Sequence, residues 1–336
     1  MLEHGGRLSA ASRRFGAPAA GWVDLSTGIN PHPWPVPVQL PVHWARLPDP
    51  DDGLLEAACM YYGAELLLPV AGSQAAIQGL PLLRPRSHVG IIAPAYAEHA
   101  RAWRRAGHAV SRLEFAHIGR HLAKLDALVV VNPGNPTGLR ISRAQLLDWH
   151  AQLASRGSWL IVDEAFMDPA PQESLMSSQI PSGLIVLRSV GKFFGLAGAR
   201  VGFVAADARL LRRLGEYLGP WSLAGPSRYV SALALRDRDW QDGARARLRR
   251  ASRRLADLLA AHGLAPDGGT ELFQWVRLAQ ASLLHALLAD RGIWTRCFSR
   301  PAGLRFGLPG DETQWCRLDQ ALAEGLAVLP APGAGA

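Results

Sequence analysis

Short apolar runs alternate with amphipathic stretches through the middle of the chain. The strand-like runs are residues 89–93, 108–113, 127–131, 159–162 and 184–187. Several of them are rich in Val, Ile and Leu without polar alternation, which is typical of strands buried on both faces of a parallel sheet. Helical patterns follow Gly72 and cover residues 98–106. The central segment therefore predicts an α/β fold, with a mostly parallel central sheet between helices.

The two ends of the chain have a different pattern of residues from the middle. Seven prolines lie between residues 31 and 50, and we expect residues 1–50 to be irregular because proline forbids a continuous helix. After residue 225, long amphipathic helices are predicted over 239–262 and 279–291, with short strands at 273–277 and 304–308, which indicates a smaller α+β domain. We predict an N-terminal arm with a small-domain segment at residues 1–45 and a large domain at residues 46–225. A small C-terminal domain follows at residues 226–328, and a flexible tail at residues 329–336.

The amino-acid composition excludes several classes of function but does not identify one. Of 336 residues 49% are hydrophobic and 19% charged, which fits a globular chain. The net charge is +8, but only two of the 36 basic residues are lysines and the arginines are scattered, so we do not expect a nucleic-acid partner. Three cysteines without a CxxC pair predict reduced thiols and no metal site, and no apolar run predicts a membrane span. We expect a cytoplasmic protein.

Polar motifs stand where the predicted strands end. They are AGSQAA at 71–76, NPGNPTG at 132–138, DEAF at 163–166 and SVGKFFGLAGARVG at 189–202. A glycine-serine helix start such as Gly72-Ser73 can bind phosphate, although most are only caps. A carboxylate at Asp163 can face a cationic ring nitrogen, an amine at Lys192 can form a Schiff base with an aldehyde, and a guanidinium at Arg200 can grip a phosphate. Each motif alone is weak, because each has a common structural explanation.

In this order and spacing the motifs outline a binding site for pyridoxal 5′-phosphate. The chain resembles the fold type I pyridoxal-phosphate enzymes over residues 20–325, and particularly their histidinol-phosphate aminotransferase-like branch. The resemblance implies a homodimer in which Lys192 is the catalytic lysine that binds the cofactor. The other residues that match cofactor ligands of the family are Gly72, Ser73, Gln74, Tyr96, Asn135, Asp163, Ser189 and Arg200.

Some of these positions have plausible alternatives, and two depart from the family. Tyr96 could equally be a core aromatic residue, and His99 either supports Asp163 or lies at the surface. Phe166 stands where the family usually has a tyrosine, so one hydrogen bond to the ring oxygen is missing. Leu47 replaces a tyrosine that in many relatives reaches the neighbouring subunit's cofactor, which puts that contact in doubt but not the dimer.

The amino-terminal motifs resemble those of the threonine-phosphate decarboxylases of cobalamin biosynthesis. The segments HGG at 4–6 and LSTGINP at 25–31 look like the arm of that group, and LRFGLPG at 304–310 fits it. The resemblance implies decarboxylation of L-threonine O-3-phosphate to (R)-1-amino-2-propanol O-2-phosphate. The implied substrate-binding residues are His4, Gly28, Asn30, Arg296 and Arg305. The alternatives are an aminotransferase of the histidinol-phosphate type, which would use the same cofactor residues, and a non-catalytic transcription regulator, for which residues 1–50 supply no winged helix.

Overall fold

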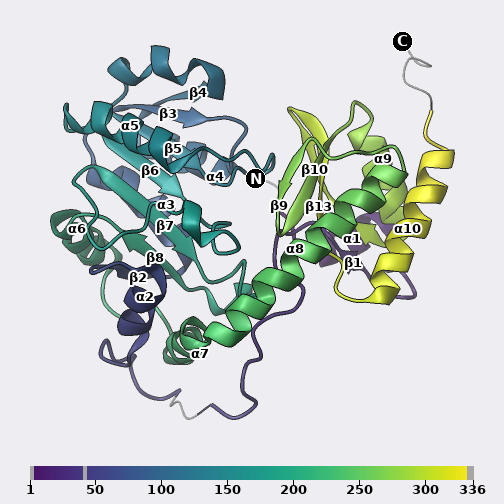
Figure 1. Cartoon of the computed structure of the whole chain (residues 1–336), viewed down its shortest axis with the longest axis horizontal. Coiled ribbons are helices and arrows are strands. Elements are labelled where there is room, and N and C mark those ends of the chain that lie inside the picture. The colour runs from purple at the N-terminus through teal and green to yellow at the C-terminus, as the bar shows by residue number, and fades with distance from the viewer. Residues whose placement is uncertain (1–3, 41–43, 331–336) are drawn as a thin grey trace. The chain divides into compact units, whose positions relative to one another are not determined.

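The computed structural model describes residues 4–40 and 44–330. The chain forms two compact units, drawn with their elements in Figure 1. The larger unit comprises Pro33–Asn135 and Arg140–Ala244, and the smaller one comprises the described parts of Met1–His32, Pro136–Leu139 and Arg245–Ala336. Helix α8 (Arg238–Ala261) begins in the larger unit and continues into the smaller one. The domain boundaries drawn from the sequence stay a prediction.

The larger unit is built around a seven-stranded sheet of order β2-β8-β7-β6-β5-β3-β4. Its strands are β2 (Leu68–Val70), β3 (His88–Ile92), β4 (Ala109–Leu113), β5 (Ala127–Val131), β6 (Trp159–Asp163), β7 (Leu184–Ser189) and β8 (Gly202–Ala205). All neighbours pair in parallel except that β8 runs antiparallel to both β2 and β7. Every residue of β5 and β7 is buried, as the continuous apolar runs predict.

Helices cover this sheet and close its core. They are α2 (Leu54–Tyr62), α3 (Gly72–Gly79), α4 (Ala97–Arg105), α5 (Arg143–Ala154), α6 (Ala208–Leu218) and α7 (Gly225–Arg236). Alternate strand residues such as Val129 and Ile161 join α3, α4 and α6 in one apolar cluster, whereas α5 packs against β6. Side-chain caps fix helix starts: the Ser142 hydroxyl accepts from the Gln145 N–H over 3.2 Å at the start of α5. The α/β class predicted from the sequence is confirmed.

The smaller unit is α+β. Its four-stranded antiparallel sheet has the order β12-β13-β10-β9, and a separate parallel pair joins β1 to β11. The strands are β1 (Val23–Asp24), β9 (Gly268–Thr270), β10 (Phe273–Arg277), β11 (Ile293–Trp294), β12 (Arg296–Ser299) and β13 (Ala302–Gly307), and the helices besides α8 are α1 (Leu8–Phe15), α9 (Ala281–Asp290) and α10 (Glu312–Ala327). No helix in the described part of the chain is long and apolar enough to cross a membrane.

The expectation that residues 1–50 are irregular is wrong for two segments. Residues 8–15 form α1, and residues 23–24 form β1. The prolines that forbid a helix begin only at Pro18, so nothing interrupts residues 8–15. Tertiary packing supports this short helix: the Phe15 ring lies 5.9 Å from the Trp294 ring, centroid to centroid.

Candidate active site

The carboxyl ends of β5, β6 and β7 meet at one edge of the larger unit's sheet. Asp163 pairs with Val131 of β5 and with Leu187 of β7. Ser189 ends β7 and pairs with Gly202 of β8. Parallel strands bring such terminal residues to a common edge, where ligands of α/β proteins gather. Two of the predicted site residues, Asp163 and Ser189, therefore stand on neighbouring strands at this edge.

The loop after β5 is fixed next to β6 by Asn132. Its N–H donates to the Asp163 carbonyl over 2.9 Å. Its side-chain amide donates to the Ile141 carbonyl over 3.0 Å, and its side-chain oxygen accepts from the Ile141 N–H over 2.9 Å. The buried asparagine thus holds both ends of the loop in which the half-buried Asn135 lies. The sequence points to Asn135 for its chemistry, whereas Asn132 serves the local fold.

Asp163 is a buried carboxylate with a fixed orientation. Only 3% of the residue is exposed. Its Oδ1 accepts from the Ala165 N–H over 3.1 Å, and its Oδ2 lies 2.9 Å from Nε2 of the buried His99. Of the two alternatives for His99, the structure gives the contact with Asp163. A buried carboxylate that is held in this way presents a negative charge at a defined place.

Tyr96 lies near the same carboxylate. It precedes α4, and its hydroxyl donates to the Gln74 side-chain oxygen over 3.2 Å. Burial, together with the charges of Glu98 and Asp163, raises the pKa of Tyr96 to about 12 against the opposing charge of Arg200. The phenol is therefore neutral near pH 7, and the predicted residues Gln74 and Tyr96 form a contact between α3 and the start of α4.

Gly72 and Arg200 lie against each other at the start of α3. Gly72 has a φ of +66°, and a Cβ at this position would lie 2.7 Å from an Nη of Arg200. Arg200 itself has a φ of 53°, and its other Nη donates to the Ala197 carbonyl over 3.1 Å. The first N–H groups of a helix and a guanidinium are both donors to anions. The absence of a side chain at Gly72 thus lets the Arg200 guanidinium approach the start of α3, and the phosphate site of Gly72, Ser73 and Arg200 stays a prediction.

Lys192 follows β7 in the segment that continues to Arg200. Its Nζ lies 5.8 Å from the centre of the Phe166 ring, and the side chain is half-buried. Phe166, from the DEAF motif, is 4% exposed. The amine therefore lies over an aromatic face that follows Asp163 by three residues.

A buried ionic network involves the residues next to Asp163 and Ser189 in the chain. The sequence analysis did not predict this network. The Arg188 guanidinium donates to Glu164 over 2.8 Å, to Asp168 over 2.6 Å and to the Ser174 hydroxyl over 3.2 Å. Its side chain lies over the Tyr62 ring. Glu164 follows Asp163, and Arg188 precedes Ser189, so the network anchors the ends of β6 and β7. An arginine inside the apolar run of β7 is the signal that could have revealed it.

In the smaller unit two arginines stand opposite each other. Arg296 of β12 pairs with Arg305 of β13. Arg305 is 6% exposed, donates to the Ser26 carbonyl over 2.7 Å and lies over the Phe273 ring at 5.1 Å. Burial, and to a lesser extent the neighbouring charge of Arg296, lower the pKa of Arg305 to about 10 against the opposing charge of Asp24. Two adjacent cations of this kind favour an anionic ligand.

A cavity of about 380 Å³ opens beside this pair. It is lined by His4, Gly5, Arg7, Ala10, Ala11, Arg14, Ser26, Ser282, His285, Trp294, Thr295, Arg296, Cys297 and Ser299. Gly5 packs closely on Ser26, where a Cβ would lie 2.4 Å from the Ser26 carbonyl oxygen, and the Gly6 N–H donates to the Ser26 hydroxyl over 2.8 Å. The HGG motif thus packs against Ser26, whose carbonyl accepts the hydrogen bond from Arg305. The structure brings the predicted residues His4 and Arg296 to one cavity.

The structure does not place all predicted substrate residues in that cavity. Gly28 is buried in the segment after β1. Asn30 is 3% exposed, and its side-chain oxygen accepts from the His32 N–H over 2.9 Å. Asn30 lines a second cavity of the smaller unit instead.

Comparison with known proteins identifies the family. Residues 41–320 match the family "Aminotransferase class I and II". The chain is 56% identical over 322 residues to the threonine-phosphate decarboxylase of Pseudomonas aeruginosa, which covers 96% of this chain and 97% of that protein. It is 43% identical over 329 residues to the threonine-phosphate decarboxylase of a Sinorhizobium species, with 96% and 98% covered.

A solved structure confirms the fold. The histidinol-phosphate aminotransferase of Sinorhizobium meliloti, in complex with pyridoxal-5′-phosphate, superimposes with a TM-score of 0.85 at 18% identity and covers 98% of this chain and 96% of that one. The chain therefore belongs to the aminotransferase class I and II family and, within it, to the threonine-phosphate decarboxylases.

Proposed function

We propose that the protein is a pyridoxal-phosphate-dependent decarboxylase that converts L-threonine O-3-phosphate to (R)-1-amino-2-propanol O-2-phosphate and carbon dioxide, for cobalamin biosynthesis. The observation that carries this proposal is the 56% identity to a threonine-phosphate decarboxylase over 96% of the chain. The aminotransferase neighbour shares 18% of its residues and shows the fold alone. Decarboxylation is therefore favoured over the histidinol-phosphate aminotransferase alternative.

The residues of the larger unit fit pyridoxal phosphate. Gly72 has no side chain to exclude the Arg200 guanidinium, which lies 2.7 Å from where a Cβ would be, so this cation and the first N–H groups of α3 would hold the phosphate together. The buried Asp163 supplies a carboxylate for the ring nitrogen, and Lys192 supplies an amine for the aldehyde. When bound, pyridoxal phosphate supplies a cationic ring that accepts the electron pair left on the α-carbon as the carboxylate departs. The remaining proposed ligands are Ser73, Gln74, Tyr96, Asn135 and Ser189.

Asp163 and His99 act together on the ring proton. A carboxylate close to a ring nitrogen favours its protonated form. The 2.9 Å contact of Asp163 with His99 and the N–H donated by Ala165 keep the carboxylate aimed in one direction, so its charge requires no rearrangement. We assign Asp163 as the group that holds the proton and His99 as the residue that positions Asp163.

Lys192 has two tasks in this proposal. Its amine would hold the cofactor through the aldehyde, and it would later donate a proton to the substrate's α-carbon in the place of the departed carboxylate. The amine lies over the Phe166 ring with its side chain half-buried, so part of its surroundings is protein and not water. Because Phe166 has no hydroxyl, Asn135 carries the hydrogen bond to the ring oxygen.

The substrate brings a phosphate and a carboxylate, and the smaller unit offers cations for them. Arg305 is held by the Ser26 carbonyl and by the Phe273 ring, so its guanidinium is fixed before substrate binds. Arg296 is opposite, and His4 lines the same cavity as Arg296. Binding of a dianion relieves the mutual repulsion of the two arginines. Gly28 and Asn30 complete the proposed set.

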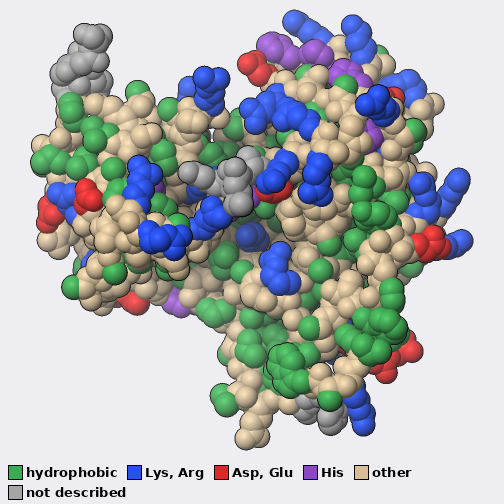
Figure 2. All heavy atoms as spheres, turned by 180° about the vertical axis from the view of Figure 1, so that it is seen from behind, with side chains coloured by type: hydrophobic (Ala, Val, Ile, Leu, Met, Phe, Trp, Pro, Cys, Tyr) green, Lys and Arg blue, Asp and Glu red, His purple; other side chains and the backbone are tan. Residues whose placement is uncertain are grey.

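We also propose a cytoplasmic homodimer. Large apolar side chains are exposed along the segment around α2: Val38 is fully exposed, Trp44 is 82% exposed, and Leu47 and Met60 are more than 60% exposed. Figure 2 shows hydrophobic side chains gathered at the lower end of the molecule, over α2 and α7. A patch of this kind is typical of a protein–protein interface. Light scattering after gel filtration measures the mass directly.

The test of the function is purified protein loaded with pyridoxal phosphate and given L-threonine O-3-phosphate without a keto acid. We expect carbon dioxide and aminopropanol phosphate in equal amounts. L-Threonine, which lacks the phosphate, is the matched control substrate. Sustained glutamate turnover with 2-oxoglutarate and no carbon dioxide would instead make the protein an aminotransferase.

A further inference from the structure

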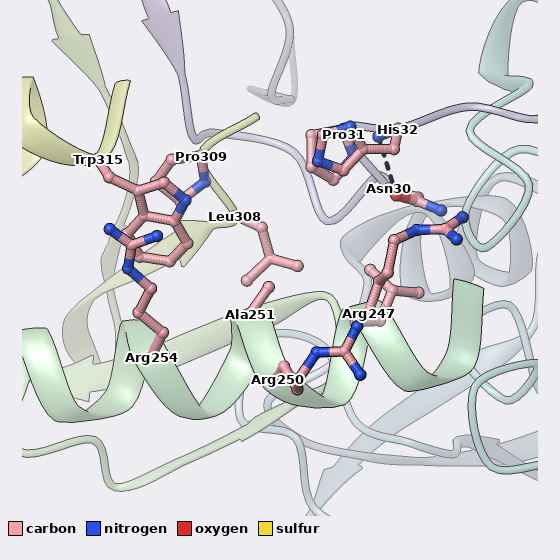
Figure 3. Close-up of a pocket in the computed structure, with 11 residues that line it drawn as sticks. Asn30, Pro31, His32, Arg247, Arg250, Ala251, Arg254, Leu308, Pro309 and Trp315 are labelled. Carbon is pink, nitrogen blue, oxygen red and sulfur yellow. Dashed lines mark hydrogen bonds between the residues drawn. The ribbon is translucent and has the colours of Figure 1, made fainter. Parts of the chain in front are cut away.

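The second cavity of the smaller unit does not contain the arginines proposed to bind substrate, Arg296 and Arg305. Its volume is about 250 Å³. It is lined by Asn30, Pro31, His32, Arg247, Leu248, Arg250, Ala251, Arg254, Leu308, Pro309 and Trp315. Figure 3 shows all three arginines on α8, with Arg254 beside Trp315, Arg247 extending toward Asn30, and Arg250 between them. None of these residues is acidic, although the cavity has four basic side chains.

Among the described residues, one of the three arginines at this cavity is paired with a carboxylate, and the other two are not. Arg254 is neutralised: it makes two hydrogen bonds to Glu312, of 2.5 and 2.7 Å, and lies over the Trp315 ring at 4.4 Å. Arg247 and Arg250 are exposed, and neither has a carboxylate partner in the described part of the chain. Two guanidinium groups one helical turn apart thus face one cavity without a counter-charge. Such a pair matches the nearly double negative charge of a phosphate monoester.

The floor of the cavity is apolar. Trp315 of α10, Leu248 of α8 and Leu308 are 6%, 3% and 4% exposed, and all three line the cavity with the arginines. Apolar lining gains binding free energy in proportion to the apolar area of a ligand that it covers. A ligand that carries an ammonium group finds no carboxylate in the lining, which disfavours the amino phosphates of the proposed reaction.

We propose that this cavity is a second anion site, which binds a phosphate monoester with an apolar or aromatic group and without a charged amine. The proposed substrate arginines Arg296 and Arg305 do not line this site, and Asn30 is the one residue of the proposed substrate set that does. The proposal does not depend on the proposed reaction, since it concerns binding alone.

The test is ¹⁹F NMR of the pyridoxal-phosphate-loaded protein labelled with 5-fluorotryptophan. Trp315 lines this cavity and Trp294 lines the other, so each resonance reports on one site. Their Phe variants assign the two resonances. We expect phenyl phosphate to move the Trp315 resonance saturably and to bind about tenfold more tightly than inorganic phosphate, because of its ring. We expect 2-aminoethyl phosphate to bind no better than inorganic phosphate.

Variants of α8 complete the test. Arg250→Gln should weaken phenyl phosphate binding at Trp315 by about tenfold or more, the effect of one lost charge-assisted hydrogen bond. Arg249→Gln, on the same helix but outside the cavity lining, is the matched control and should leave binding unchanged. Arg247→Gln provides a second, independent variant. A Trp315 resonance that stays in place, or that moves equally in Arg249→Gln and Arg250→Gln, overturns the proposal, as does tighter binding of 2-aminoethyl phosphate than of phenyl phosphate.

Discussion

Replacement of Arg188 by methionine should strongly destabilise the larger unit. The side chains of Glu164 and Asp168 are completely buried, and Arg188 is their shared cation at 2.8 and 2.6 Å. Burial alone would lower the pKa of Arg188, but Asp168, Tyr62 and Glu164 together raise it above its ordinary value. The guanidinium therefore stays charged, and its removal leaves two carboxylates in the core without a counter-ion.

The size of the effect follows from these contacts. Removing one partner of a buried ion pair costs about 3–5 kcal/mol, because the remaining charge is left in a medium of low dielectric. Arg188 serves two carboxylates, so we expect Arg188→Met to lower the free energy of unfolding by about 4 kcal/mol or more at pH 7.5. Methionine preserves most of the side-chain volume, so little of this loss arises from a cavity.

The assay is urea unfolding of the cofactor-free protein, followed by far-UV circular dichroism. The matched control is Arg291→Met, which breaks the 2.9 Å pair between the half-buried Arg291 and the exposed Glu324 at the surface. A surface pair in contact with water contributes far less to stability than a buried one, because solvent screens its charges. Equal losses in the two variants would refute the reasoning, because they would mean that burial does not raise the cost of the unpaired carboxylates.

The loss should also depend on pH. Burial raises the pKa of Glu164, although Arg188, the Leu175 N–H and Ser174 oppose the rise. A carboxyl group whose folded-state pKa is raised binds its proton more tightly in the folded state, so it contributes stability at low pH and loses it as the pH rises. Without Arg188, one of the groups that oppose this effect is lost, so the pKa of Glu164 rises further. The deficit of Arg188→Met relative to wild type should therefore shrink between pH 7.5 and 5.5, and an unchanged deficit would contradict this account.

Three further predictions concern the proposed site. Lys192→Ala should abolish both the visible absorbance of bound cofactor and turnover, whereas Lys124→Ala, at the only other lysine, should leave both intact; absorbance retained in the Lys192 variant would exclude its role. Gly72→Ala should weaken cofactor binding measured by dialysis, because its Cβ would lie 2.7 Å from a guanidinium nitrogen at a φ of +66°, whereas Gly198→Ala meets nothing within 4 Å and should bind normally. Arg305→Gln should raise KM for threonine phosphate by about 10–100-fold, the effect of one lost ionic hydrogen bond, and an unchanged KM in steady-state kinetics would exclude it from substrate binding.

The local signals in the sequence determined much of the larger unit. Continuous Val/Ile/Leu runs placed β5, β6 and β7 within two residues of their observed bounds, because a strand buried on both faces tolerates little else. The motifs after these strands placed Asp163 and Ser189 at one edge of the sheet, since parallel strands share that edge. Motif order also identified the family, which the comparisons confirm.

Contacts between distant segments were decided only by the tertiary structure. No local pattern shows that Arg188 meets Glu164 and Asp168, because those side chains come from different strands and loops and are joined by burial. Helix α1 was missed because its support is a packing contact with Trp294, far along the chain. The cavity at Trp315 likewise exists only because α8 lays its arginines beside α10 and the segment after β1. Sequence fixes which residues are available for chemistry, whereas three-dimensional packing decides which of them share an environment and hence a function.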